Sequence, residues 1–256
     1  MNTINRSTSA LLRSCIVGFL LSSLAPLALA QSDDATYVRV FVTTVKSDRV
    51  SEFEDLLRQR SEGLDAAGAG FRSVYQSLVG EQFTYLMVDY VPSKAALDGP
   101  LAPGAAVPPG WGSRNDAAQS AQTMLLMRRY PELRIPAEEG SERGLVQVRI
   151  RRTAPGRTQD YYDWQLNQLL PALREAGVTG VFINRVILGG SAQTWMSFSS
   201  LESMSSFDDA VMALAESMGE RESEQMIERG AAMLVHTEDL IMRYRSDLSF
   251  FNADRL

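Results

Sequence analysis

Two stretches of this 256-residue sequence nearly repeat each other: "TMLLMRRYPEL" (Thr123–Leu133) and "EDLIMRYRSDL" (Glu238–Leu248). When Met127 is placed over Met242, 115 residues later, both stretches contain an apolar pair, Met-Arg, an Arg and a Tyr in either order, an acid and a leucine. Solenoid repeats have periods of roughly 20–50 residues. A period this long therefore indicates a duplicated domain.

Three earlier pairs of segments align in the same order along the chain. They are "YVRVFVTTVKSDRVSEFEDLL" from Tyr37 with "LVQVRIRRTAPGRTQDYYDWQ" from Leu145, "VYQSLVG" from Val74 with "INRVILG" from Ile183, and "TYLMVDYVPS" from Thr84 with "TWMSFSSLES" from Thr194. The shifts are 108, 109 and 110 residues. Each match is weak, but four matches in one order support a duplication of the whole unit.

Each unit shows the same order of predicted elements. Alternating apolar residues over 38–43 predict a strand, and apolar residues at helical spacing from Val50 to Leu64 predict a helix that "AAGAG" ends. Strands are expected around 72–79 and 83–91, then a second helical region and the closing strand. The second unit is predicted to have a strand at 145–152, a helix at about 157–175 with a kink at Pro171, strands near 180–188 and 192–200, helices at about 203–218 and 221–236, and the closing strand.

This order, βαββα with a closing strand, resembles the ferredoxin-like unit of the dimeric α+β barrel superfamily over nearly all of residues 36–250. The resemblance implies an α+β fold in which two tandem ferredoxin-like units form an intramolecular barrel, with antiparallel sheets inside and helices outside. Residues 31–135 and 136–256 are the two predicted half-barrels. The chain would repeat because one barrel needs two halves.

The first thirty residues have the pattern of a secretory signal peptide, with two arginines, a short apolar run, and Ala28-Leu29-Ala30 before a cut ahead of Gln31. The protein is therefore expected to be periplasmic or secreted, with no membrane segment after cleavage. The single cysteine, Cys15, lies within this segment, so the mature chain has no thiol for disulfides or metal binding. Its 23 basic and 31 acidic residues give a net charge of −8, which argues against nucleic-acid binding.

The strands predict a candidate ligand site. Even-numbered positions are apolar in both copies, including Val38, Val40, Val146 and Val148, and are expected to face the helices. Odd-numbered positions mix polar and aromatic residues and are expected to face each other across the barrel lumen. One predicted wall holds Arg39, Phe41 and Tyr85, and the other holds Gln147, Arg149, Trp195 and Ser197. The arginines would bind a carboxylate and the aromatic rings would cover a flat molecule; the alternative is a closed interface with arginines paired to Asp89.

Three other features allow more than one interpretation. The Pro- and Gly-rich segment 97–115 is expected to be a surface loop without helix, or a lid with Trp111 at its tip. The arginines of "MRRY" and "MRYR" are expected to protect exposed strand edges. His236, the single histidine, is expected near a helix end, where it would interact favourably with the helix dipole.

The resemblance also implies possible chemistries. Chlorite-dismutase-like and dye-peroxidase-like relatives hold haem through a histidine of the C-terminal half, which would be His236 here. Relatives of the antibiotic-biosynthesis monooxygenase group oxidise aromatic substrates without a cofactor, and Trp, Tyr, Arg and Asn184 near one lumen resemble such a site loosely.

Three functional hypotheses follow from the sequence. The first is a non-catalytic protein that binds a small, flat or anionic molecule. The second is an oxidative enzyme, either with haem on His236 or without a cofactor. The third is a structural or protein-interaction role through the closing strands or the outer helices.

Overall fold

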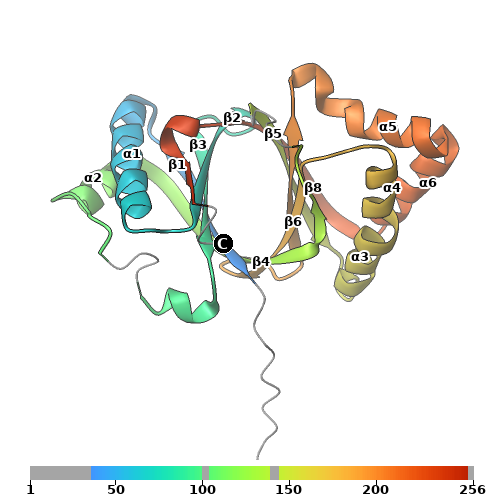
Figure 1. Ribbon diagram of the computed structural model, residues 1–256, viewed down its shortest axis with the longest axis horizontal. Helices are drawn as coiled ribbons and strands as arrows, with labels where there is room; N and C mark the ends of the chain where they lie inside the picture. Colours follow the sequence, from blue (N-terminus) through green and yellow to red (C-terminus); the bar gives the residue numbers. More distant parts are fainter. Residues whose placement is uncertain (1–35, 100–103, 139–143, 253–256) are drawn as a thin grey trace, which may run out of the picture. The chain divides into compact units, whose positions relative to one another are not determined.

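The computed structural model describes residues 36–99, 104–138 and 144–252, and the predicted signal peptide and its cleavage site before Gln31 lie outside them. In the described part, nine strands form one antiparallel sheet in the order β3-β1-β4-β6-β7-β5-β8-β2-β9. An additional pairing between β2 and β3 closes eight of them into a barrel (Figure 1). The strands are β1 (Tyr37–Val45), β2 (Phe71–Val79), β3 (Thr84–Val91), β4 (Gln119–Ile135), β5 (Leu145–Thr153), β6 (Val181–Leu188), β7 (Thr194–Leu201), β8 (Leu234–Tyr244) and β9 (Phe250–Phe251). The predicted α+β barrel is confirmed.

The helices lie outside the barrel, with α1 and α2 on one side and α3 to α6 on the other (Figure 1). They are α1 (Val50–Ala66), α2 (Trp111–Ala118), α3 (Thr158–Trp164), α4 (Leu170–Glu175), α5 (Asp209–Met218) and α6 (Glu220–Ala231). A π-helical turn (Gln165–Leu169) joins α3 to α4 just before Pro171, where the sequence predicted a kink. Short 3₁₀ turns cover Ser47–Arg49, Lys94–Leu97, Met204–Asp208 and Ser246–Leu248. No helix within the described ranges combines the length and apolar character needed to cross a membrane.

The two repeated stretches join the half-barrels to each other. β4 pairs with β1 of its own half and with β6 of the other half, and β8 pairs with β5 and with β2. Met127 of β4 lies opposite Val38 and Val186. Met242 of β8 lies opposite Val146, the counterpart of Val38. Each copy of the stretch therefore closes the sheet of the other half, which explains why the chain contains it twice.

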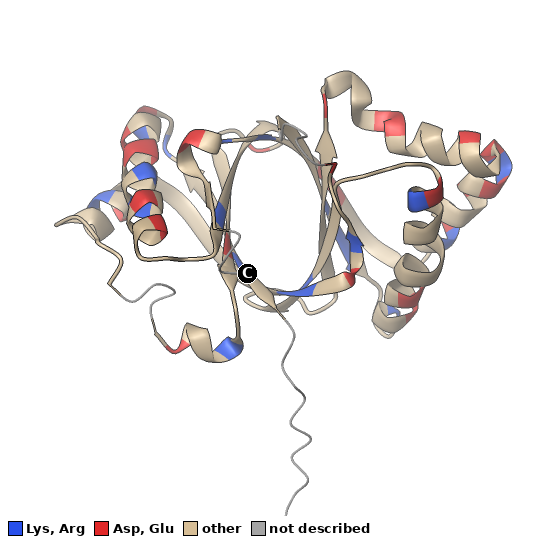
Figure 2. Cartoon of the chain, in the orientation of Figure 1, with Lys and Arg blue, Asp and Glu red and all other residues tan. Residues whose placement is uncertain are grey.

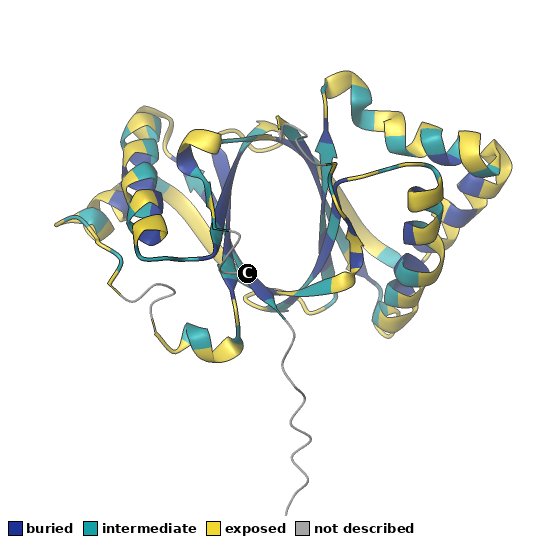
Figure 3. Cartoon of the chain, in the orientation of Figure 1, coloured by how far each residue is buried: buried dark blue, intermediate teal, exposed yellow. Residues whose placement is uncertain are grey.

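The interior of the barrel is an apolar core to which both halves contribute. Its buried members are Val38, Val40, Tyr75, Leu86, Val88, Met127, Val146, Val148, Val186, Met196, Phe198 and Met242. Figure 3 shows the strands largely buried and the helices exposed on their outer faces. The even-numbered positions of β1, β3, β5 and β7 therefore point into the barrel. The sequence-based assignment of the two faces is wrong, because it placed these residues under the helices.

The physical reason for the reversed faces lies in what covers each side of the sheet. An eight-stranded barrel has an interior just wide enough for side chains to fill, so this face must be mostly apolar. The outer face is covered by helices, whose polar side chains supply hydrogen-bond partners. The buried Tyr85 shows this, because its hydroxyl donates a hydrogen bond to Glu54 of α1 at 2.6 Å. A mixed polar and aromatic face therefore suits the helix side.

The segment 97–115 ends in a helix that the sequence did not predict. α2 begins at Trp111, directly after Gly110, which follows the last proline of the segment. The Trp111 indole donates a hydrogen bond to the Leu56 carbonyl of α1 at 2.9 Å. In the same segment, the Ala106 carbonyl oxygen lies so close to Gly63 that a Cβ there would be 2.7 Å from it. The described part of this segment thus packs on α1, and Trp111 does not reach the barrel mouth as a lid would require.

The interior position of the two methionines can be tested by truncation. Met127→Ala and Met242→Ala should each lower the free energy of unfolding by about 2–5 kcal/mol, because each leaves a cavity in a packed core. Met124→Ala is the matched control on β4, where the side chain is 50% exposed; it should change stability by less than about 0.5 kcal/mol. Urea unfolding measures all three. Equal small losses would contradict the interior assignment.

Candidate functional site

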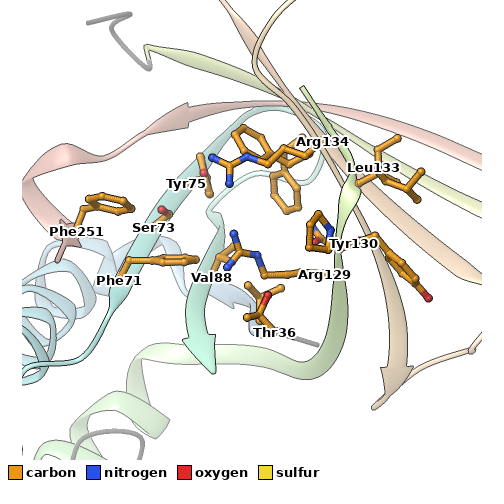
Figure 4. A pocket seen from close by; sticks show the side chains of 16 residues that line it. Thr36, Phe71, Ser73, Tyr75, Val88, Arg129, Tyr130, Leu133, Arg134 and Phe251 are labelled. Carbon is orange, nitrogen blue, oxygen red and sulfur yellow. The ribbon is translucent and has the colours of Figure 1, made fainter. Parts of the chain in front are cut away.

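A cavity of about 200 Å³ lies inside the barrel, near the first residues of β1 and β2 and the last residues of β4. Figure 4 shows Phe71, Ser73 and Tyr75 along one side, with Arg129 and Arg134 of β4 reaching towards them from the other. Both halves of the chain contribute to the lining. The cavity combines aromatic surface with two guanidinium groups, a composition that suits a flat anion.

A bulge in β4 allows both arginines to reach the cavity. Arg129 is paired with Asn184 of β6, and Arg134 with Phe182, so five steps along β4 match two along β6. Bulges of this kind re-aim side chains next to binding sites. The Arg129 guanidinium lies 5.9 Å from the centre of the Phe71 ring, and that of Arg134 lies 4.9 Å from the Phe182 ring. The cations are therefore held against aromatic walls.

Neither guanidinium has a carboxylate partner among the residues that the structure describes, whose buried ion pairs involve other arginines. Burial and the nearby charge of Arg134 lower the pKa of Arg129, although a guanidinium stays protonated in proteins. Figure 2 shows acidic and basic residues interspersed on the helices, whereas β4 carries basic stretches. Two like charges in a partly dry site repel each other, and an anion between them would stabilise both.

Two nearly buried polar side chains also line the cavity. Ser73 of β2 and Asn184 of β6 are each 8% exposed. Within the described ranges, neither side chain takes part in a hydrogen bond. Buried polar groups are normally hydrogen-bonded. The hydroxyl and the amide are therefore available to a molecule in the cavity.

The polar residues Arg129 and Asn184 of the cavity wall are not conserved between the two copies of the repeat. The counterparts of Arg129 and Asn184 in the other half are Tyr244 and Tyr75, at shifts of 115 and 109 residues. The rings of these two tyrosines pack against each other with centres 5.6 Å apart. One junction between the halves therefore has a packed aromatic pair where the other junction has an arginine and an amide. The different order of Arg and Tyr in "MRRY" and "MRYR" was the sequence feature that could have revealed Arg129.

The first predicted wall packs under α1 instead of facing the lumen. Tyr85 is fully buried, with its ring 5.1 Å from that of Phe53, and Phe41 packs against the same cluster. Burial and the neighbouring Glu54 raise the pKa of the Tyr85 hydroxyl, which also accepts a hydrogen bond from Gln76 at 2.9 Å. These contacts explain Tyr85 as a structural residue of the first half.

Arg39, the third residue of this wall, belongs to a buried ion cluster. Its guanidinium lies 3.0 Å from the Asp89 carboxylate, which also accepts two hydrogen bonds from Arg72 at 2.6 and 2.9 Å. Burial disfavours the ionised carboxylate, but Arg72 and Arg39 together hold the pKa of Asp89 below its ordinary value. The alternative interpretation, in which the arginines pair with Asp89, therefore describes Arg39.

The second predicted wall lies on the opposite outer side of the barrel, under α3. Its members are Gln147, Arg149, Trp195 and Ser197. Arg149 lies 3.4 Å from Asp239, and the Trp195 ring is 5.9 Å from that of Tyr161. The two walls are therefore separated by the barrel, and the prediction that they face each other is wrong. Ligand binding by these residues stays a prediction, but the shared lumen on which it was based is not present between the two walls.

His236 also lies away from the cavity. The helix predicted to reach residue 236 ends at Ala231, so His236 stands exposed near the start of β8. Its nearest acid is Glu238, 3.6 Å away. β8 is the counterpart of β4 in the repeat. The cavity is lined by the last residues of β4, whereas His236 lies near the start of β8. Asn184 was named from the sequence as part of a loose resemblance to the site of the cofactor-free monooxygenases, and it does line the cavity.

The Asp89 cluster predicts an acid-sensitive fold. Because the pKa of Asp89 is lower in the folded state, its contribution is present above the unfolded value of about 3.9 and is lost as the pH falls through the folded value. Asp89→Asn should lower the free energy of unfolding by about 3–5 kcal/mol at neutral pH, because it leaves buried guanidinium groups unpaired. It should also reduce the loss of stability below about pH 4. Urea unfolding at several pH values measures both effects.

Asp239→Asn is the matched control. Asp239 pairs with Arg149 and Arg151 but its side chain is 37% exposed, so its removal should cost less than about 1 kcal/mol. Equal losses for the two variants would refute the buried role of Asp89.

Comparison with known proteins shows which solved structures have a similar fold. No protein-family model and no curated protein matches the sequence. Among solved structures, a candidate monooxygenase from Fusobacterium nucleatum subsp. nucleatum matches with a TM-score of 0.59 and 9% identity, covering 85% of this chain and 98% of that one. A candidate monooxygenase from Lactobacillus acidophilus NCFM matches at 0.58 and 9%, covering 85% and 96%. An anthrone oxidase-like protein matches at 0.58 and 13%, covering 88% and 96%. At these identities the likeness concerns the fold alone: the chain is an α+β barrel with the fold of the dimeric α+β barrel superfamily, and here both half-barrels belong to one polypeptide.

Proposed function

We propose that the protein binds a small aromatic carboxylate in the barrel cavity. The observation that carries this proposal is the pair of cavity arginines, Arg129 and Arg134, without a carboxylate partner in the described part of the chain. A guanidinium offers paired donors that match a carboxylate. The surrounding Phe71, Tyr75 and Phe198 supply the apolar surface that a flat ring needs.

The size of the cavity limits the ligand. An apolar cavity of about 150 Å³ holds one benzene molecule, so about 200 Å³ accommodates one ring with one or two substituents. A tetrapyrrole is several times larger than benzene, which disfavours haem as the occupant of this cavity. A ligand of about nine non-hydrogen atoms is expected to bind with a Kd on the order of 10–1000 μM.

The proposal includes the expected location. Residues 1–30 have the pattern of a signal peptide, so we propose that the mature chain begins at Gln31 and acts after export. N-terminal sequencing of the protein from the exported fraction tests this, and an intact Met1 would refute it.

Arg129→Met tests the carboxylate contact. Isothermal titration with benzoate should show a loss of affinity of roughly 10–100-fold, because a charge-assisted hydrogen bond is removed. Benzamide has the same shape without the charge, so its weaker binding should change by less than roughly threefold. The melting temperature should stay equal or rise, because the variant loses a partly buried cation without a described partner.

Arg128→Met is the matched control, because Arg128 is the neighbouring residue on β4, is exposed and does not line the cavity. It removes the same charge from the protein and should leave benzoate binding unchanged. If benzoate does not bind the unaltered protein, or if both variants weaken it equally, the cavity is not a carboxylate site.

A second candidate function is an oxidative enzyme that acts on a hydroxylated aromatic acid in the same cavity without a resident cofactor. The support for it is the fold shared with two candidate monooxygenases and an anthrone oxidase-like protein, which is analogy because one fold serves many reactions. Oxygen uptake in the presence of hydroxylated benzoates should then exceed the protein-free rate and should fall in Arg129→Met. Uptake at the protein-free rate for all ligands that bind would leave the binding function alone.

A further inference from the structure

Asn184 stands beside Arg129 in the wall of the cavity. The two residues are direct partners on neighbouring strands β6 and β4, so their Cβ atoms are within about 4.5–5.5 Å of each other. Both line the cavity. A carboxylate that binds Arg129 therefore brings its neighbouring atoms close to the Asn184 amide.

Packing does not explain an amide at this position. Asn184 is 8% exposed, and among the described residues its side chain forms no hydrogen bond. Leaving such a group unpaired costs free energy, whereas an apolar residue would fill the same space. The other half of the barrel has Tyr75 at the equivalent position, packed against Tyr244. The amide thus stands where the repeat shows that an aromatic ring is accommodated.

The amide adds a chemical property that the arginines lack. A guanidinium has five N–H donors and no acceptor, whereas an asparagine amide has an acceptor oxygen as well as donors. A hydroxyl or amino group on the ligand ring needs an acceptor for its hydrogen. Asn184 Oδ1 is an acceptor on the strand beside Arg129, so it would lie close to the carboxylate end of a ligand that binds Arg129.

We infer that Asn184 determines specificity, and that the cavity prefers aromatic acids with a hydroxyl or amino group at the 2- or 3-position of the ring. This inference rests on the proposed function, because it assumes that the carboxylate binds Arg129. A substituent at the 4-position points away from the carboxylate and lies beyond the pair formed by Arg129 and Asn184.

The test compares four ligands on the intact protein by isothermal titration near neutral pH: benzoate, 2-hydroxybenzoate, 3-hydroxybenzoate and 4-hydroxybenzoate. The better of the 2- and 3-isomers should bind at least roughly tenfold more tightly than benzoate, the typical effect of satisfying a buried amide. The 4-isomer should bind about as tightly as benzoate.

Asn184→Leu should reduce the preference for the hydroxylated isomer to about onefold and leave benzoate affinity within roughly threefold. Its melting temperature should rise, because the unpaired amide is replaced by an apolar side chain of similar size. Asn167→Leu is the matched control, because Asn167 is exposed on the π-helical turn and does not line the cavity. It should leave all four affinities and their ratios unchanged.

Asn184→Asp is a second variant of the same shape, which keeps the test decisive if the leucine variant does not fold. Its carboxylate would pair with Arg129, so all four acids should bind at least roughly tenfold more weakly. Unchanged affinities in this variant would overturn the assigned neighbourhood of Arg129 and Asn184 in the ligand site.

The outcomes separate the inference from the proposed function. If no acid binds, both fail. If all four acids bind equally, if the preference is confined to the 4-isomer, or if it survives Asn184→Leu, the inference about Asn184 is overturned while the carboxylate site stands. A preference for the 2- or 3-isomer that disappears in Asn184→Leu and persists in Asn167→Leu supports it.

Discussion

The pairing of β4 and β8 with strands of both halves is the constraint on which the rest of the structure depends. A four-stranded half-sheet alone would expose an edge with unpaired backbone groups, and each closing strand covers the edge of the other half. Once eight strands are closed into a ring, the interior has a fixed size and must be filled by side chains. Met127 and Met242 occupy it at equivalent positions. The barrel interior, the helix-covered outer face and the place of the cavity all follow from this closure.

The cavity exists because the two halves are not identical where they meet. Tyr75 and Tyr244 pack against each other where β2 meets β8, whereas Asn184 and Arg129 occupy the equivalent positions where β6 meets β4. The same bulge of β4 brings in Arg134, whose counterpart Ser249 instead donates a hydrogen bond to the Arg245 carbonyl at 2.7 Å. A symmetric aromatic core would be the more stable filling, because unpaired buried polar groups cost free energy. Residues that lower stability in this way are expected at binding sites.

The order of elements and the duplication could be predicted from the sequence, but the faces of the strands could not. A period of two shows that the faces alternate, and it does not show which face points inward when both are covered. The mixed residues around Arg39 and Tyr85 are compatible with helix cover because Asp89 and Glu54 supply their partners, and those contacts are not visible in the sequence. The arginines of the closing strands were attributed to edge protection, but neither β4 nor β8 is an edge. Arg129 was missed for this reason.

The distribution of acidic residues strengthens the case for an anionic ligand. The sequence carries 31 acidic and 25 basic residues, so carboxylates are not scarce. Asp89 neutralises Arg39 and Arg72, Asp239 neutralises Arg149 and Arg151, and Glu54 and Asp247 neutralise Arg245, all on the helix-facing side or at the barrel rim. In the described part of the chain, the cavity arginines Arg129 and Arg134 lack such a partner. A fixed aspartate there would stabilise the fold and remove the attraction for an anion. The positive charge of Arg129 and Arg134 therefore has a physical explanation if the partner comes from solution, as a carboxylate that fits between the two cations and the aromatic wall.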